Sequence, residues 1–480
     1  MEYDVLIIGA GVTGCAIAQQ VAQLDLKTAV LEKELDVCEG TSKANSGIVH
    51  AGYDALPGTL KARFNVRGAE LIPVLAQQLG FGFRNTGSLV LCLDEAGRDK
   101  LEELKRRGQT NGVPGLEILE REEVLQREPH ANPAVTCALW APTAGIVDPF
   151  GMTVALADNA AENGTEFLFG QPVQRVERVS MENGEPGWLV NGTYKTRILV
   201  NAAGCHAGEI HELACQEPLR IRPRKGEYFL FDREAGSLAS CVLFPLPTDK
   251  GKGVLVTPTV HGNLLAGPTA EFTEDPQDTA TTRSGLADVQ AKAGQTLPEL
   301  PWRQVITSFA GLRAVPDGGD FIVQESAPAF IDAAGIESPG LTSAPAIGEY
   351  VAALVREQLQ AAEKAGAVKT RRPFVNLNEI TPQEWNDLIR QNPAYGQIVC
   401  RCETIVEGQI LDACTRPVPA RTLDGVKRRV RAGMGRCQGG FCSPRVMEIL
   451  AQVQNADLAA IRKSGPGSVI ITGEDKEDLA

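Results

Sequence analysis

Long hydrophobic runs are absent from this 480-residue sequence. No stretch of about 18 apolar residues is free of both charge and glycine, which argues against a membrane-spanning helix. The chain starts directly with a strand pattern and lacks the basic and apolar segments of a secretory signal. We therefore expect a cytoplasmic protein with no transmembrane segment. Peripheral association with a membrane through a partner is compatible with this expectation.

The sequence also lacks an excess of basic residues. Acidic residues number 60 against 47 basic ones, and the formal net charge is −13. Proteins that bind nucleic acid present basic surfaces to its phosphates, so no nucleic acid partner is expected. The chain is too long for a single core, and its content of hydrophobic residues is that of an ordinary globular protein. Two or three domains are expected.

The twelve cysteines do not indicate a disulfide framework, because the chain is long and has no secretion signal. Seven are scattered over residues 1–241 and are expected to be small buried apolar groups. The last five fall within residues 400–442, where four form two spaced pairs. The fifth, Cys414, lies outside both pairs and is expected to be buried.

The first 32 residues predict a βαβ unit. Residues 4–9 (DVLIIG) are apolar and β-branched, as in a buried parallel strand. Residues 15–24 predict a helix, and residues 27–32 predict a second strand that ends on an acid. The pattern GxGxxG stands between the first strand and the helix, which is its place in a dinucleotide-binding unit.

Each glycine of this pattern, and the acid that ends the second strand, has a steric or polar role. Gly9 permits the tight turn, Gly11 lets a pyrophosphate approach the backbone, and Gly14 lets the helix pack closely on the strand. The amino terminus of the helix favours the anionic pyrophosphate, and Glu32 can accept hydrogen bonds from a ribose. The motif alone does not distinguish FAD from NAD.

Three later segments resemble the D-amino-acid-oxidase-like superfamily of FAD enzymes. Residues 40–54 (GTSKANSGIVHAGYD) are similar to its flavin-embracing loop, and residues 201–204 (NAAG) to a strand end beside the flavin. Residues 344–348 (APAIG), expected just before a helix at 349–358, are similar to its closing segment. The resemblance implies an α/β fold, in which a Rossmann-type FAD-binding domain carries an inserted mixed-sheet substrate domain.

The same resemblance implies which residues contact FAD. Besides the three glycines and Glu32, they are Val12, Thr13, Lys33, Thr41, Ser42, Asn45, Ser46, Gly47, Val173, Ala203, Gly204, Arg313, Ala346, Ile347 and Gly348.

Three further segments resemble the L-2-hydroxyglutarate dehydrogenase branch of this superfamily. They are residues 50–62 (HAGYDALPGTLKA), 222–229 (RPRKGEYF) and 255–268 (LVTPTVHGNLLAGP). The branch also contains proteins similar to the catalytic subunit of anaerobic glycerol-3-phosphate dehydrogenase, whose tail resembles the one described below. The resemblance implies an FAD-dependent dehydrogenase that oxidises a small anionic secondary alcohol. We expect sn-glycerol 3-phosphate, with L-2-hydroxyglutarate or a related 2-hydroxyacid as the alternative.

Candidate substrate ligands are cations in an otherwise acidic chain. Arg222, Arg224 and Lys225 stand within four positions, and Arg313 follows a glycine-bearing strand. A guanidinium suits a carboxylate or phosphate because its donors form a planar fork. The superfamily commonly holds its substrate anion with an arginine near Arg313. The alternatives are a structural ion pair for Arg313 and a solvated strand end for Arg224 and Lys225.

His50, one of only five histidines, is the candidate catalytic base. An imidazole can take the hydroxyl proton while the hydride leaves the carbon for the flavin. The alternative is a histidine that only hydrogen-bonds the flavin or the backbone. Tyr228 and Tyr53 are further candidates for substrate contact, although either can simply pack.

The four paired cysteines predict a metal site. Cys400 and Cys402 form a CxC pair, and Cys437 and Cys442 form a Cx4C pair 34 residues later. CxC is tight for structural zinc, whereas thiolate pairs also hold iron–sulfur clusters. The pattern resembles the bacterioferritin-associated-ferredoxin-like (BFD-like) domain, in the form fused to anaerobic glycerol-3-phosphate dehydrogenase and to amine and opine dehydrogenases. The resemblance implies a [2Fe–2S] cluster, with zinc or no metal as alternatives.

No second GxGxxG follows a strand, so the sequence offers no NAD site. Electrons taken up by a flavin then need another exit, and a [2Fe–2S] cluster accepts them one at a time. We expect the cluster to pass them to a flavin, iron–sulfur or quinone-linked partner subunit. An amine or imino-acid dehydrogenase and a non-enzymatic electron-relay subunit are the remaining alternatives.

These motifs predict the domain layout. The oxidoreductase domain is expected at 1–365, with FAD parts at about 1–80, 150–215 and 305–365 and substrate parts at about 80–150 and 215–305. A linker with a short helix at 383–390 is expected at 366–395, the small helical BFD-like domain at 396–455, and a flexible tail at 456–480.

Overall fold

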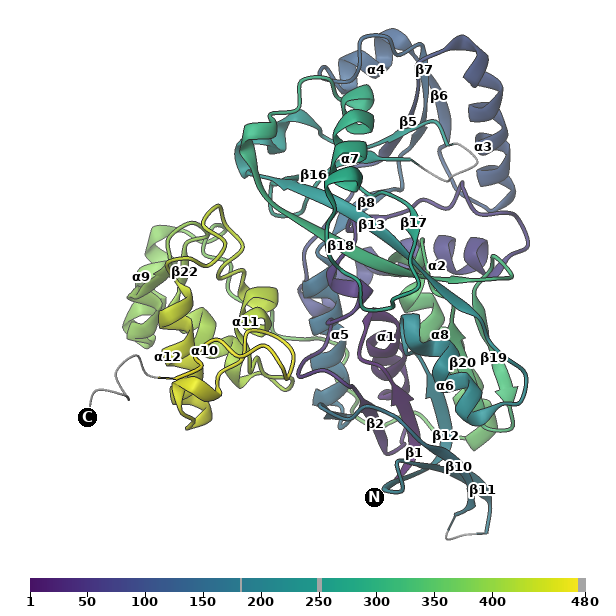
Figure 1. Ribbon diagram of the computed structural model, residues 1–480, viewed down its shortest axis with the longest axis vertical. Helices are drawn as coiled ribbons and strands as arrows, with labels where there is room; N and C mark the ends of the chain where they lie inside the picture. Colours follow the sequence, from purple (N-terminus) through teal and green to yellow (C-terminus); the bar gives the residue numbers. More distant parts are fainter. Residues whose placement is uncertain (182–183, 248–252, 474–480) are drawn as a thin grey trace.

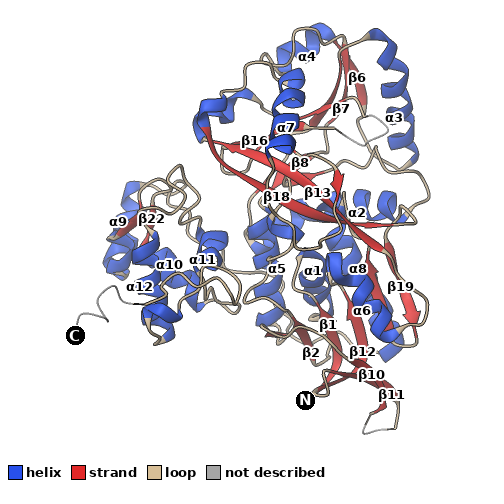
Figure 2. Cartoon of the chain, viewed as in Figure 1, coloured by secondary structure: helices blue, strands red, loops and turns tan. Residues whose placement is uncertain are grey.

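The computed structural model describes residues 1–181, 184–247 and 253–473. A large body, built around two sheets, carries a smaller carboxyl-terminal lobe at its side (Figure 1). The lobe is mainly helical, whereas the body combines both kinds of element (Figure 2). Within the described residues, no helix is long and apolar enough to cross a membrane.

The first sheet of the body has eight strands, in the order β10-β11-β12-β1-β2-β9, with β20 added beside β12 and β19 beside β20. Its central strands run parallel and are almost wholly buried; they are β1 (Glu2–Ile8), β2 (Thr28–Leu31), β12 (Tyr194–Asn201) and β20 (Phe330–Ala334). The others are β9 (Glu166–Leu168), β10 (Val176–Ser180), β11 (Pro186–Val190) and β19 (Ile322–Ala327). This is a Rossmann-type sheet assembled from separate segments of the chain.

Helices cover this sheet and one another. Helix α1 (Val12–Val21) packs against α5 (Pro149–Glu162) and α8 (Gly340–Leu359), and α2 (Leu60–Leu79) packs against α8. Glycine permits the close approach of α8 to α1, since a Cβ on Gly348 would lie 2.6 Å from the carbonyl oxygen of Ala16.

The predicted start of helix α8 was wrong. Residues 344–348 lie inside α8, which begins at Gly340 and continues through Pro345. A proline inside a helix removes the hydrogen bond to the carbonyl four residues earlier, here that of Leu341. Leu341 lies on the wall of a cavity, so a hydrogen-bond donor of a bound ligand could reach that carbonyl.

The second sheet has nine strands and is mixed, because β5 and β14 pair in parallel and the other pairs are antiparallel. Its strands are β5 (Ser88–Cys92), β6 (Glu117–Glu120), β7 (Cys137–Ala141), β13 (Ile221–Phe231), β14 (Val242–Pro245), β15 (Leu255–Pro258), β16 (Leu264–Gly267), β17 (Glu271–Phe272) and β18 (Val305–Pro316). Helices α3 (Arg98–Thr110), α4 (Arg121–Arg127) and α7 (Arg283–Thr296) flank it. A small third sheet, β3 (Ile48–Val49), β8 (Gly145–Val147) and β4 (Phe83–Arg84), lies between the two.

The carboxyl-terminal lobe has its own apolar core, which includes Ile410, Val426 and Leu450. Its elements are α9 (Pro382–Gln391), β21 (Ile398–Cys400), β22 (Ile405–Val406), α10 (Glu407–Thr415), α11 (Leu423–Val430) and α12 (Ser443–Gln454). The segment before it is attached to the body, because the buried Arg371 donates to Asp158 at 2.8 Å.

A flexible tail was expected at 456–480. In the structure, residues 456–473 instead pack on the lobe and contact the body. Ile461 is buried in the core of the lobe, and the Ser464 hydroxyl donates to Glu39 of the body at 3.0 Å. Besides the burial of Ile461, hydrogen bonds from the amides of Leu423 and Asp424 to the carbonyls of Arg462 and Lys463 hold this stretch on the lobe. Residues 474–480 lie outside the described part of the chain.

Candidate active site and cluster site

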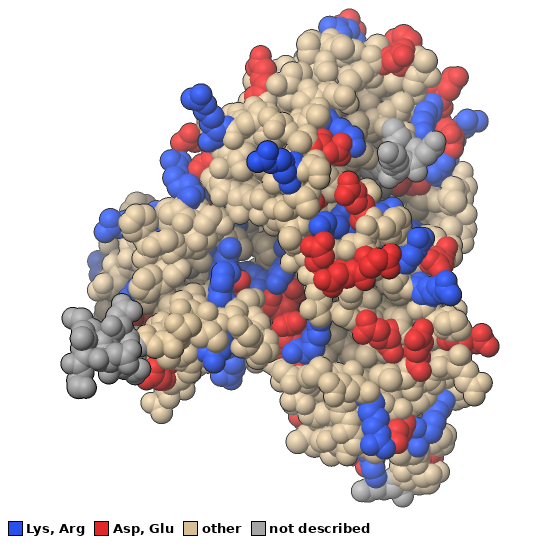
Figure 3. All heavy atoms as spheres, in the orientation of Figure 1, with Lys and Arg blue, Asp and Glu red and all other residues tan. Residues whose placement is uncertain are grey.

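A cavity of about 2410 Å³ lies where the two sheets of the body and the lobe meet. In Figure 3 a hollow separates the lobe from the body, and both basic and acidic side chains lie beside it. The predicted site residues on its wall are Gly9, Gly11, Val12, Thr13, Glu32, Lys33, Thr41, Ser42, Asn45, Ser46, Gly47, His50, Tyr53, Val173, Ala203, Gly204, Arg224, Tyr228 and Arg313. Segments far apart in sequence therefore converge on one space.

The glycine turn after β1 is shaped for a close ligand. A Cβ on Gly14 would lie only 1.9 Å from the carbonyl oxygen of Gly9, so helix and turn approach as the motif requires. No side chain caps the amino terminus of α1, and Val12 and Thr13 face the cavity there. The Val12 amide donates to the Ser42 hydroxyl at 2.8 Å, which ties the 40–54 loop to the helix start. The positive helix end fits the pyrophosphate of FAD.

Glu32 lies at the end of β2 with its carboxylate buried on the cavity wall. Its two oxygens accept hydrogen bonds from the amides of Ala10 at 2.7 Å and Glu34 at 2.9 Å. Burial raises the pKa of Glu32, and these two amide bonds partly oppose that shift. The carboxylate is thereby oriented, and its remaining lone pairs can accept hydrogen bonds from ribose hydroxyls.

Four charged side chains form what we call the substrate cluster: Lys61, Arg224, Arg313 and Glu337. Glu337 accepts from Lys61 at 2.7 Å and from Arg224 at 2.8 Å. Arg313 stands opposite Arg224 in the β13–β18 register and donates to the carbonyl of Thr269 at 2.6 Å. Three positive charges thus face one negative charge on the cavity wall, and the buried Nε of Arg224 has no hydrogen-bond partner among the described residues. This arrangement can bind an anion.

His50 is fixed through its backbone on the same wall. Its amide donates to the Thr342 hydroxyl at 3.0 Å, and its carbonyl accepts from the Asn65 side chain at 2.6 Å. The imidazole ring lies 5.8 Å from the ring of Phe244. Tyr228 stacks on Phe309 with centroids 4.8 Å apart, and burial raises its pKa, so that its phenol stays protonated.

Six predicted site residues do not line the cavity: Gly14, Arg222, Lys225, Ala346, Ile347 and Gly348. Lys225 is turned to the other side of β13, where it donates to Asp278 at 2.7 Å. Successive residues of a strand point to opposite faces, so Arg224 and Lys225 cannot both serve the site. Ala346, Ile347 and Gly348 lie within α8 and pack toward α1, because the helix begins earlier than expected. Its first residues line the cavity in their place.

Three site residues were not predicted: Glu337, His261, and Lys61, which stands in the quoted segment 50–62. Glu337 stands in no motif, and only the fold brings it between Lys61 and Arg224. His261 is placed on the cavity wall beside Asp148, whose carboxylate lies 3.2 Å from its Nε2. Its position within the quoted segment 255–268 is the one feature that could have singled it out.

The four paired cysteines lie in the lobe as two close pairs, and within the described residues they do not form a tight group of three or more metal ligands. The Sγ atoms of Cys402 and Cys437 are 3.5 Å apart, whereas Cys400 and Cys442 pair with each other. A hydrogen bond from the Cys442 thiol lowers the pKa of Cys400 to about 6, against the effect of burial, with help from the amides of Gly433 and Glu403. Amides that point at thiolate sulfurs suit an iron–sulfur cluster, so the donor set fits one.

The two cysteine pairs face different surroundings. Cys442 lies on the wall of the large cavity that also contains the glycine turn and His50. Cys402, in contrast, is exposed, and the nearby Phe441 has 88% of its surface accessible. One side of the cysteine site therefore faces the predicted flavin region and the other faces the outside of the protein.

The fold and these two sites define a flavoprotein oxidoreductase with an attached iron–sulfur domain. The chain belongs to the family of FAD dependent oxidoreductases (DAO), which matches residues 4–354. Residues 398–452 match the BFD-like [2Fe-2S] binding domain. FAD and a [2Fe–2S] cluster are accordingly its cofactors.

Comparison with individual proteins agrees with this assignment. The chain is 45% identical to glycerol 3-phosphate dehydrogenase of Caloramator mitchellensis, over 99% of this chain and 100% of that protein. It is 30% identical to L-2-hydroxyglutarate dehydrogenase of Caenorhabditis elegans, over 56% of this chain and 64% of that protein. Among solved structures, L-alpha-glycerophosphate oxidase of Mycoplasma pneumoniae, with FAD bound, matches 78% of this chain and 100% of its own, at a TM-score of 0.73 and 30% identity.

Proposed function

We propose that this protein is an FAD-dependent dehydrogenase that oxidises the secondary hydroxyl group of sn-glycerol 3-phosphate. The substrate cluster carries this proposal, because Lys61, Arg224 and Arg313 outnumber the single carboxylate of Glu337. A phosphate group fits an excess of positive charge and the planar fork of a guanidinium. The similarity to a glycerol 3-phosphate dehydrogenase over the full length, lobe included, supports the same substrate.

The oxidation removes a hydride from the substrate carbon and a proton from its hydroxyl oxygen, which leaves a ketone. Bound FAD supplies the hydride acceptor, and the [2Fe–2S] cluster supplies a one-electron exit. We assign the proton to His50, whose backbone is held on both sides so that the imidazole stays at the cavity. Arg313 and Arg224 would hold the substrate anion, and the Tyr228 phenol can donate a hydrogen bond to it.

Oxidation of L-2-hydroxyglutarate is the second candidate. The same cluster fits a carboxylate as well as a phosphate, and the similarity to an L-2-hydroxyglutarate dehydrogenase covers more than half of the chain. Electron transfer from the cluster to a flavin, iron–sulfur or quinone-linked subunit, and a cytoplasmic location, stay predictions.

One anaerobic experiment tests both candidates. The purified protein is mixed with glycerol 3-phosphate, L-2-hydroxyglutarate, L-lactate or L-proline, and visible and EPR spectra are recorded. Bleaching of the flavin by glycerol 3-phosphate alone, followed by a reduced cluster signal, is the expected result. Bleaching by another compound would show that this compound, and not glycerol 3-phosphate, is the substrate. Failure of every compound to bleach the flavin would favour an electron-relay subunit.

A further inference from the structure

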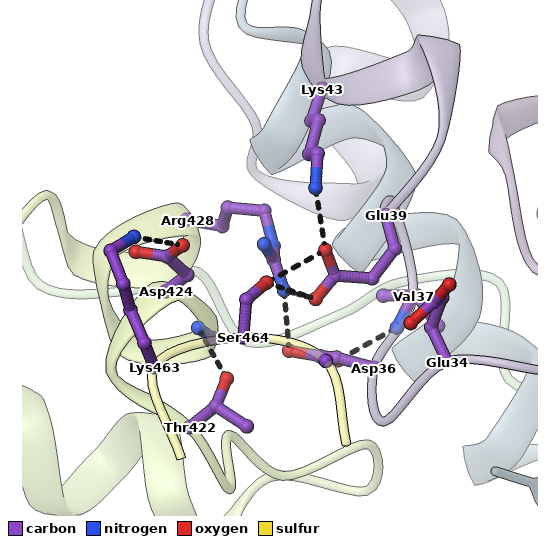
Figure 4. A network of polar contacts seen from close by, with 12 residues as sticks. Glu34, Asp36, Val37, Glu39, Lys43, Thr422, Asp424, Arg428, Lys463 and Ser464 are labelled. Carbon is purple, nitrogen blue, oxygen red and sulfur yellow. Dashed lines mark hydrogen bonds and ion pairs between the residues drawn. The ribbon is translucent and has the colours of Figure 1, made fainter. Parts of the chain in front are cut away.

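A buried network of ion pairs joins the lobe to the loop at 33–40, which follows β2 (Figure 4). On the side of the loop the acceptors are Asp36 and Glu39, and on the side of the lobe the donors are Arg428 and Arg429 of α11. Arg429 donates to both oxygens of Asp36, at 2.6 and 2.8 Å, and Arg428 donates to Asp36 and Glu39. We call these four residues the α11 clamp.

The α11 clamp is almost completely shielded from solvent. The side chain of Arg429 is 0% exposed and that of Asp36 is 1% exposed, and Arg428 and Glu39 are each 4% exposed. Burial by itself would raise the pKa of Asp36, but the two guanidinium groups outweigh it, and the pKa is lowered. The charges are therefore compensated within the clamp, and the lobe cannot leave the body without breaking these ion pairs.

The loop that the clamp holds begins with one predicted FAD contact, Lys33, and has others on both sides. Glu32 precedes it, and Thr41 and Ser42 follow it directly. Both ends are tied to the glycine turn, since Glu32 accepts from the Ala10 amide and Ser42 accepts from the Val12 amide. Movement of this loop would consequently reach the FAD site.

The helix that provides the donors leads directly to the cysteines. Arg431, the residue that follows α11, caps the helix in a left-handed conformation with φ +67°. Gly433 then donates its amide to the sulfur of Cys400, and the chain reaches Cys437 four residues later. Only a few residues of chain therefore separate the donors of the α11 clamp from the cluster ligands.

From these contacts we propose that Arg428 and Arg429 are positioning residues, which fix the cluster at its working distance from the flavin through Asp36 and Glu39. The inference rests on the presence of FAD and of the cluster, and it is independent of which alcohol is oxidised. Electron transfer between two centres slows steeply as their separation grows. A loosened clamp therefore slows the passage of electrons to the cluster while leaving the chemistry at the substrate cluster intact.

The test compares Arg429→Gln and Arg428→Gln with a matched control, Arg445→Gln. Arg445 lies in the same lobe and pairs with Glu407 and Glu448 at its surface, 48% exposed. The flavin of each full-length holoprotein is reduced by a light flash with an external donor, so that no substrate is needed. Visible spectroscopy then follows the flavin, and freeze-quench EPR follows the reduced cluster.

We expect cluster reduction to slow about tenfold or more in Arg429→Gln and less in Arg428→Gln, because the first removes the bidentate pair. Flavin reduction by substrate and cluster reduction in Arg445→Gln should stay within about twofold of wild type. The rate of backbone amide hydrogen exchange in residues 33–40 should rise in Arg429→Gln and Arg428→Gln and stay unchanged in Arg445→Gln. Should Arg429→Gln fail to fold, Arg428→Gln and Arg429→Lys provide the same comparison.

Two results would overturn the proposal. One is an unchanged rate of cluster reduction in variants whose loop exchange shows that the clamp has opened. The other is an equal slowing of substrate-driven flavin reduction and of cluster reduction, which would indicate a general effect on the fold. Failure of glycerol 3-phosphate as substrate would not affect the first outcome, because the flash replaces it, and the second would then be measured with the compound that does bleach the flavin.

Discussion

The sulfur atoms of Cys402 and Cys437 lie 3.5 Å apart although they come from different spaced pairs of the sequence. The CxC and Cx4C pairs are therefore not the pairs formed in space, where Cys402 faces Cys437 and Cys400 faces Cys442. Each spatial pair therefore needs a second segment of the chain. The loop before α12 provides that segment.

Replacing Cys402 by serine should remove the cluster. A serine hydroxyl is a poor substitute for a thiolate, and even the loss of a neighbouring hydrogen-bond partner lowers metal affinity about 10–100-fold. We expect the iron and sulfide content to fall about tenfold or more, while the flavin spectrum persists. Cys414→Ser is the matched control, because this buried cysteine lies outside both pairs. Equal iron in both variants would contradict the ligand assignment.

Gly14→Ala should abolish FAD binding. The added Cβ would lie 1.9 Å from the carbonyl oxygen of Gly9, which cannot move without opening the turn, so the cost is about 3 kcal/mol or more. The FAD content and the thermal unfolding temperature of the purified protein measure this. Gly294→Ala in α7 serves as the control, since Gly294 does not line the cavity and its Cβ would meet nothing within 4 Å. Full FAD content in Gly14→Ala would show that the turn is looser than described.

Arg313→Gln should weaken substrate binding more than turnover. Hydrogen bonds to charged groups contribute about 1.5–3 kcal/mol, which corresponds to a KM about 10–100-fold higher. Arg222→Gln, on the neighbouring strand, is the control, because Arg222 pairs with Asp317 outside the cavity. Steady-state kinetics with glycerol 3-phosphate as the varied substrate distinguishes the two variants. An unchanged KM in Arg313→Gln would assign Arg313 a purely structural role.

His50→Gln should lower kcat about 10²–10⁴-fold if the imidazole accepts the hydroxyl proton. The rate of flavin bleaching in a single anaerobic turnover is the direct measurement, and its dependence on pH should flatten. His130→Gln provides the comparison, since His130 is exposed and away from the cavity. Bleaching at the normal rate in His50→Gln would leave this histidine with a binding role only.

Asp36→Asn should destabilise the protein at neutral pH by about 3–5 kcal/mol, because Arg428 and Arg429 would stay buried with one fewer negative charge. The pKa of Asp36 is lowered in the folded protein, since the guanidinium groups outweigh its burial. Its contribution is therefore complete above the ordinary aspartate pKa of about 4 and is lost as the pH falls through the lowered value. Melting curves of both proteins between neutral and acid pH measure the difference. A difference that does not shrink in acid would contradict the charge assignment.

Much of the site follows from local sequence rules. The turn at 9–14 could be predicted because strand, glycines, helix and acid stand at fixed spacings, and the observed turn has the expected close packing. The cysteine site could be predicted for the same reason. The turn depends on one short segment, whereas the pairing of the thiols in space joins two segments and did not follow from their spacing.

The remaining features depend on long-range packing. Lys225 was assigned with Arg224 because the alternation of a strand cannot tell which face meets the cavity. Glu337 reaches Lys61 and Arg224 only through the meeting of three segments. The ion pairs of Asp36 likewise link residues more than 390 positions apart, and no local pattern marks such partners.

The discontinuous first sheet has a consequence for biosynthesis. Strand β1 leaves the ribosome early, yet it pairs with β12, which in turn pairs with β20, and α1, which also packs on α5, is fully covered only when α8 has been made. The nascent chain must therefore carry an uncovered helix and an unpaired strand edge through most of its synthesis, a state prone to association with other chains. The second sheet, which is complete at Pro316, can assemble before the first. A polypeptide released before residue 340 would accordingly carry an intact glycine motif and still be unable to retain its flavin.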